Sequence, residues 1–169
     1  MKRTASLSDD GLYRYGLERC WEPELYGAAR VGILWVMLNP STADGTRDDP
    51  TLRRCIAFSK AWGYSSLEVV NLYARRTRDP KILSGFRDPV GPDNAWNIQQ
   101  AIGRSMFVVA AWGTRPKIMQ GDLQAVRVLE ALRFGGRKVH CLGINQDGSP
   151  RHPLYVAADQ PAVRYWGSG

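Results

Sequence analysis

The sequence predicts an α/β domain on a central, mainly parallel sheet, and three observations support this fold class. Short apolar runs recur along the chain, at 33–38, 67–73, 106–111 and 138–142. Each run is mainly apolar, which is typical of strands buried on both faces. Helical patterns separate the runs, as the crossovers between parallel strands require. The 169 residues match one domain over 1–169, of which 1–11 are polar and expected to be loosely ordered.

The segments between the runs carry the signals of helix ends. Asp49 and Pro50 are typical of an N-cap and a first helical residue. A second helix is expected after 91–93, and a third covers 122–134. Upstream of the first apolar run, residues 12–19 alternate apolar and polar side chains, which predicts an edge strand.

Composition limits the kinds of partner and cofactor. Lys and Arg number 23 against 16 Asp and Glu, a formal net charge of +7. Because guanidinium groups match phosphate oxygens in pairs, this excess favours single-stranded nucleic acid or a nucleotide, although many basic domains have no such partner. The three cysteines lack metal-ligand spacing, so neither a metal nor another cofactor is expected. No apolar stretch is long enough for a bilayer, so we expect a cytoplasmic protein without a membrane partner. The oligomeric state stays open.

Special residues stand where the predicted strands end. Asn39 follows the first apolar run, Asn71 interrupts the second, and Trp112 follows the third. In parallel sheets with helical crossovers, ligands bind outside the carboxyl ends of the strands. These positions therefore predict a ligand site at that edge.

Each candidate also has a structural interpretation. The amide of Asn39 can orient a water molecule, or it can bond its own turn backbone. Asn71 can read the edge of a base, or it can tie a neighbouring loop. His152 can donate to a leaving group, or it can be a structural histidine. Asp44 is a candidate general base, or a solvated loop charge.

The remaining candidates would hold the rest of a ligand. Trp112 and Tyr73 offer flat rings for stacking on a base, although core packing is the favoured interpretation for Trp112. Ser41, Arg75 and Arg76 lie in the loops that follow the first two apolar runs, and we predict that they contact phosphate.

Four segments together resemble a family found in bacteria and phages and described as domain of unknown function 1643. These segments contain Asn39-Pro40-Ser41, Val70-Asn71-Leu72, Trp112-Gly113 and His152-Pro153-Leu154-Tyr155, and the resemblance extends over most of the chain. The layout is also distantly similar to the uracil-DNA glycosylase superfamily, whose fold has three α/β/α layers around a parallel sheet. That similarity implies roles: Asn39 in the water-positioning loop, Asn71 pairing with the base, and His152 stabilising the departing base.

Leu154 stands where that superfamily has a serine that contacts the DNA backbone, which argues against duplex binding. Extruding a base from a duplex costs a few kcal/mol, so a nucleotide or a single strand is the easier substrate.

The sequence leaves two hypotheses about function. One is an N-glycosidic hydrolase acting on a base in nucleic acid, a nucleotide or a modified nucleoside, with a place in DNA repair or modification. The other is a binding module that keeps the pocket without the chemistry.

Overall fold

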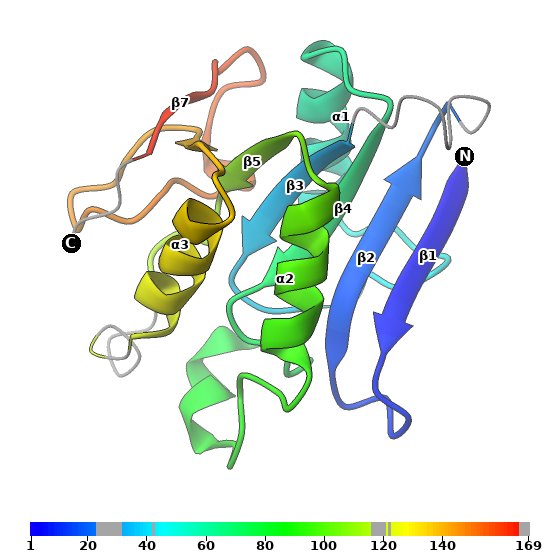
Figure 1. Cartoon of the computed structure of the whole chain (residues 1–169), viewed down its shortest axis with the longest axis vertical. Coiled ribbons are helices and arrows are strands. Elements are labelled where there is room, and N and C mark those ends of the chain that lie inside the picture. The colour runs from blue at the N-terminus through cyan, green and yellow to red at the C-terminus, as the bar shows by residue number, and fades with distance from the viewer. Residues whose placement is uncertain (23–31, 42, 116–120, 122, 166–169) are drawn as a thin grey trace.

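One seven-stranded sheet organises the computed structural model, which describes residues 1–22, 32–41, 43–115, 121 and 123–165. The strands lie in the order β1-β2-β4-β3-β5-β6-β7 (Figure 1). Their bounds are β1 (Lys2–Leu7), β2 (Arg14–Cys20), β3 (Gly32–Met37), β4 (Ser66–Asn71), β5 (Phe107–Ala110), β6 (Val139–Cys141) and β7 (Val163–Arg164).

The four predicted apolar runs form the parallel centre of the sheet. β4, β3, β5 and β6 are neighbours in that order, and all three pairings between them are parallel. The three outer pairings, β1 with β2, β2 with β4, and β6 with β7, are antiparallel. The prediction of a mainly parallel sheet is therefore wrong for the sheet as a whole, which is mixed. Antiparallel neighbours need no crossover helix, so short strands at both ends of the chain can extend the parallel centre.

The N-terminal residues differ most from expectation. Residues 1–11 were expected to be loose, yet Lys2–Leu7 form β1. Residues 12–19 were expected to form an edge strand, yet β2 lies inside the sheet between β1 and β4. β1 is the actual edge strand. Because five of its six side chains are exposed, its sequence lacks the alternation that marks a half-buried strand.

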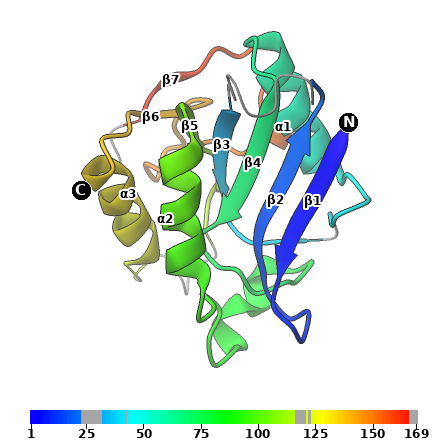
Figure 2. The same ribbon diagram turned by 45° about the vertical axis from the view of Figure 1, so that its right-hand side comes forward.

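Helices cover both faces of the sheet (Figures 1 and 2). α1 (Pro50–Ala61) packs on one face, and α2 (Asn94–Arg104) and α3 (Gln124–Phe134) pack on the other. The predicted cap of α1 is confirmed, because the Asp49 carboxylate accepts a hydrogen bond from Leu52 N at 2.8 Å. Two short 3₁₀ helices, η2 (Pro80–Gly85) and η4 (Pro153–Tyr155), lie in the loops.

Alternate residues of β3 supply the two cores. Leu34 and Val36 pack with side chains of α2 and α3, whereas Ile33 and Trp35 pack with side chains of α1. This two-residue period on a wholly apolar strand is why the run predicted burial on both faces. Within the described residues, no helix combines the length and apolarity needed to cross a membrane.

Candidate functional site

A cavity of about 560 Å³ lies at the carboxyl edge of the parallel strands. β4 and β5 lie on opposite sides of β3, so the strand order reverses there. The segments that follow β3 and β5 both line the cavity. Sheets of this kind hold their ligands at such a switch in strand order. The volume falls within the range of about 300–1,000 Å³ that is common for small-molecule sites.

Hydrogen bonds between two loops place Asn39 on the cavity wall. The loop after β4 pairs with the loop after β3 through Thr77 N, which donates to Pro40 O at 3.0 Å. The Asn39 side chain adds to this pairing, because its Nδ2 donates to Thr77 O at 2.9 Å and to Pro40 O at 3.1 Å. The Nδ2 group of Asn39 thus holds the loop after β3 against the loop after β4. Within the part of the chain that the structure describes, its Oδ1 accepts no hydrogen bond, so it is available to a ligand or a water molecule.

Asn71 is the last residue of β4, lines the cavity and is only 1% exposed. Among the described residues, neither its Oδ1 nor its Nδ2 has a hydrogen-bond partner. Its backbone oxygen is occupied, because Asn94 Nδ2 donates to it at 3.0 Å. A buried amide without partners costs about 1–3 kcal/mol, so the structure retains an unmet pair of donor and acceptor at the cavity.

His152 faces the cavity as a neutral imidazole. Its Nδ1 accepts a hydrogen bond from Leu154 N at 3.2 Å, so the ring proton lies on Nε2. Burial lowers the pKa of His152 below its usual 6.5, and the nearby Asp49 charge only partly opposes that shift. At neutral pH the ring therefore offers Nε2–H as a donor without carrying a charge.

Arg54 and Gly113 hold His152 in place. Arg54, on α1, donates to Pro153 O at 3.1 Å and to Val156 O at 2.6 Å, which fixes the loop of η4 to that helix. Gly113 lets the loop approach the end of β5, because a Cβ at this position would lie 3.2 Å from His152 Cβ. Its φ of +71° also disfavours any side chain.

Gly113→Ala should therefore displace His152 as well as destabilise the fold. Backbone strain alone should cost about 1–2 kcal/mol of unfolding free energy. Gly136→Ala is the matched control, because Gly136 has a φ of +70° with nothing within 4 Å of its Cβ position. Both variants should lose stability in denaturant titrations, but only Gly113→Ala should shift the His152 imidazole NMR signals. Equal His152 signals in the two variants would contradict the close approach.

Asp44 lies outside the cavity and serves its own turn. Its carboxylate accepts hydrogen bonds from Thr46 N at 2.7 Å, Thr46 Oγ1 at 2.9 Å and Arg47 N at 2.8 Å. These donors lower the pKa of Asp44 to about 2. Such a carboxylate is a poor proton acceptor, so the structure gives the sequence-based role of general base no support.

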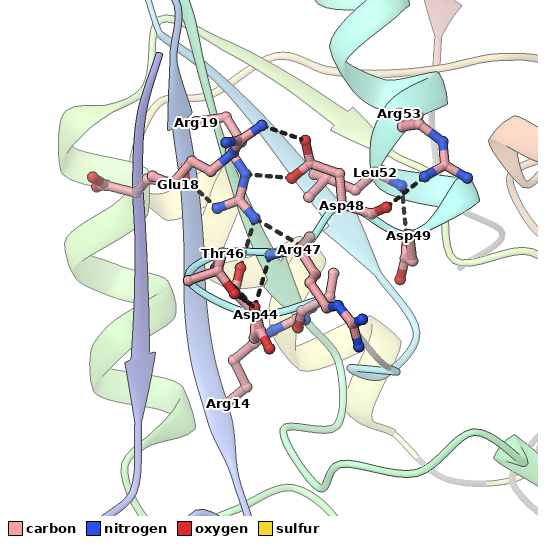
Figure 3. A network of polar contacts seen from close by, with 12 residues as sticks. Arg14, Glu18, Arg19, Asp44, Thr46, Arg47, Asp48, Asp49, Leu52 and Arg53 are labelled. Carbon is pink, nitrogen blue, oxygen red and sulfur yellow. Dashed lines mark hydrogen bonds and ion pairs between the residues drawn. The ribbon is translucent and has the colours of Figure 1, made fainter.

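Arg19 ties this loop to the sheet, as Figure 3 shows. Its side chain is fully buried, and its Nε donates to Asp48 Oδ1 at 2.7 Å. The two Nη atoms donate to three backbone oxygens: Glu18 O, Asp44 O and Arg47 O. The network fixes the segment immediately before Asp49.

Asp49 is the acidic residue that lines the cavity. Its Oδ1 caps α1, and within the described residues no hydrogen bond involves its Oδ2. The sequence explained Asp49 mostly as a helix cap, so it was not predicted as a site residue. The available signal was its place at the end of the loop that follows the first central strand.

Of four other residues predicted to contact a base or a phosphate, two line the cavity and two do not. Trp112 and Ser41 line the cavity. Tyr73 instead packs in the core beneath α2 and α3, while Arg75 stacks on Phe86, with its guanidinium carbon 4.3 Å from the ring centroid. Both lie beyond the end of β4, where the strand alternation that fixes Asn71 no longer holds.

Arg76 also lies outside the cavity, where its Nη1 donates to Gly11 O at 3.2 Å. The cations that do line the cavity are Arg14, Arg78 and Arg151. Cys55 contributes an inert wall, since burial raises the pKa of its thiol. Within the described residues, no cluster of three or more His, Cys, Asp or Glu side chains could hold a metal ion.

Comparison with known proteins gives one match. The sequence model of a family described as "Protein of unknown function (DUF1643)" matches residues 14–154. The chain belongs to this family. The matched range contains the cavity residues Asn39, Asp49, Asn71, Trp112 and His152. No curated protein and no solved structure matches the chain.

Proposed function

We propose that this DUF1643 protein is an N-glycosidic hydrolase that releases a base from a nucleotide, a modified nucleoside or nucleic acid. The proposal includes a uracil-DNA glycosylase-like arrangement of the parallel strands. The unpartnered, buried amide of Asn71 is the observation that carries the proposal. An amide presents a donor beside an acceptor, which matches the edge of a pyrimidine or another base.

The other groups at the cavity fit the two parts of the hydrolysis, which are attack by water and departure of the base. A water molecule held by Asn39 Oδ1 would attack C1′ of the sugar, with Asp49 Oδ2 accepting its proton. As the C1′–N bond breaks, the bond electrons pass to the base. The Nε2–H of His152 would then donate a hydrogen bond to the developing negative charge, and Trp112 would stack on the ring.

The alternative is a binding module with the same pocket and no chemistry. A pocket filled by side chains would have favoured loss of the chemistry, whereas the open cavity of about 560 Å³ has room for a ligand under either function, so an assay must separate the two. The direct test is to incubate the purified chain with nucleosides, nucleotides and base-modified oligonucleotides and to measure free base by chromatography. Release that requires His152 would support the hydrolase, whereas tight binding without release would support the module.

Asn71→Asp should change which base edge is accepted. A carboxylate offers acceptors only, so a base that presents an amino group should gain over one that presents a carbonyl. Such a swap is worth about 1–3 kcal/mol of discrimination. Binding measured by calorimetry against uracil-type and cytosine-type ligands, with turnover on the same pair, checks this.

Asn71→Leu is the companion variant, because leucine is similar in size and has no polar atoms. If the amide exists to meet a ligand, removing it should raise the unfolding free energy of the ligand-free protein by about 1 kcal/mol while abolishing base binding. Loss of stability in Asn71→Leu, with unchanged selectivity in Asn71→Asp, would show that Asn71 is only structural.

A further inference from the structure

Arg14 is a buried cation on the cavity wall. It begins β2, its residue is 4% exposed, and it lines the cavity together with Leu17 of the same strand. β2 is antiparallel to β4, so its first residues lie beside the carboxyl end of β4, where Asn71 is. Burial lowers the pKa of Arg14 to about 10, which still leaves the guanidinium charged at neutral pH.

A β-bulge directs this side chain into the cavity. The pairing of β1 with β2 shifts from Ser6 opposite Gly16 to Leu7 opposite Arg14, so Tyr15 is an extra residue. Tyr15 lies beside residues at the start of α2, on the face opposite to the cavity. In a regular strand, Arg14 and Leu17 would point to opposite faces because they are three residues apart. The bulge brings both onto the cavity side, an effect that β-bulges commonly have near functional sites.

Among the residues that the structure describes, no carboxylate forms an ion pair with the guanidinium of Arg14. Its Nη1 donates to Ala43 O, but Nε is buried without a partner, and no ion pair includes Arg14 within the described residues. Arg19, five positions along the same strand, shows the contrast: it contacts the same loop and pairs with Asp48 (Figure 3). The charges of Asp49 and Asp44 act on Arg14 and raise its pKa, but burial outweighs them. Because buried charges are normally paired in direct contact, Arg14 is suited to bind an anion that enters the cavity.

We infer that Arg14 binds the phosphate of a nucleoside monophosphate whose base contacts Asn71. This names the substrate class of the proposed hydrolase and, for the base, rests on that proposal. Among the described residues, the charged groups that line the cavity are the cations Arg14, Arg78 and Arg151 and one carboxylate, Asp49. The excess of two positive charges matches the dianion of a phosphate monoester. A diester within a strand carries one charge and would need two exits for its chain, so its phosphate fits a deeply buried arginine less well.

The test is calorimetric binding of inorganic phosphate, nucleoside 5′-monophosphates and the matching nucleosides to the full chain. Arg14→Met should weaken binding of phosphate and of at least one monophosphate about tenfold or more, because hydrogen bonds to charged groups are lost. Its effect on nucleosides should be small. Arg127→Met is the matched control, since it removes the same charge from an exposed position on α3, away from the cavity. Arg14→Lys keeps the charge and serves where methionine impairs folding; it should weaken monophosphate binding by losing the paired donors.

Three results would overturn the inference: equal affinity for monophosphates and nucleosides, an unchanged phosphate advantage in the Arg14 variants, or no binding of phosphate or monophosphates at millimolar concentration. Tighter binding of an oligonucleotide without terminal phosphates than of any monophosphate would assign the arginine to a diester instead. Arg14-dependent binding without base release would leave the phosphate site intact and remove the hydrolase. Equal base release from nucleosides and monophosphates would support the hydrolase and contradict the phosphate site.

Discussion

His152→Ala should slow base release about a hundredfold or more, because removing one donor to a developing anion typically has that effect. The KM should change little, since the Nε2–H acts mainly in the transition state. The expectation rests on the geometry of the ring. Leu154 N occupies Nδ1, so Nε2 is the nitrogen that carries the proton at the cavity. Steady-state kinetics on any substrate found in the base-release assay would measure both parameters.

His152→Asn separates catalysis from folding. The asparagine oxygen can accept from Leu154 N as Nδ1 does, so the cap of η4 is kept. Its shorter amide cannot reach as far into the cavity. We therefore expect His152→Asn to restore the stability lost in His152→Ala without restoring the rate. Recovery of both by asparagine would mean that His152 only holds the loop.

Arg19→Met should lower the unfolding free energy by about 3 kcal/mol, because removing one partner leaves a buried charge without compensation. The side chain of Arg19 is 0% exposed and that of Asp48 is 15% exposed. Methionine would also leave three backbone oxygens without their donor, and the loop that precedes Asp49 would lose its tie to β2. Urea titration of the variant against the unchanged protein measures the loss.

Arg3→Met is the matched control for this prediction. Arg3 contacts the same carboxylate, with its Nη2 3.4 Å from Asp48 Oδ2, but its own side chain is 42% exposed. An exposed pair of this kind is worth less than about 1 kcal/mol. Similar losses in the two variants would show that burial of Arg19 does not decide the stability of the loop.

The sequence by itself determined the parallel centre of the fold. Strands buried on both faces are apolar throughout, and the cap at Asp49 is a local hydrogen bond, so neither needs distant contacts to be recognised. Asn39 and Asn71 at or beside strand ends, and His152 in the closing loop, were predicted to converge on one edge, and all three line one cavity. β1 carried no such signal, because its side chains are exposed and only its pairing with β2 makes it a strand.

The tertiary structure alone decided which polar groups stay unpaired at that edge. Arg14 and Arg19 are two arginines on one strand, and nothing local shows that Asp48 pairs with the second while a bulge turns the first into the cavity. Asp44 and Asp49 share a loop, yet Thr46 and Arg47 occupy the first carboxylate and the second faces the cavity. Asn71 and Tyr73 separate because β4 ends between them. The fates of the two arginines depend on a partner distant in sequence and on a shift in strand register, and the alternation of side chains along the chain shows neither.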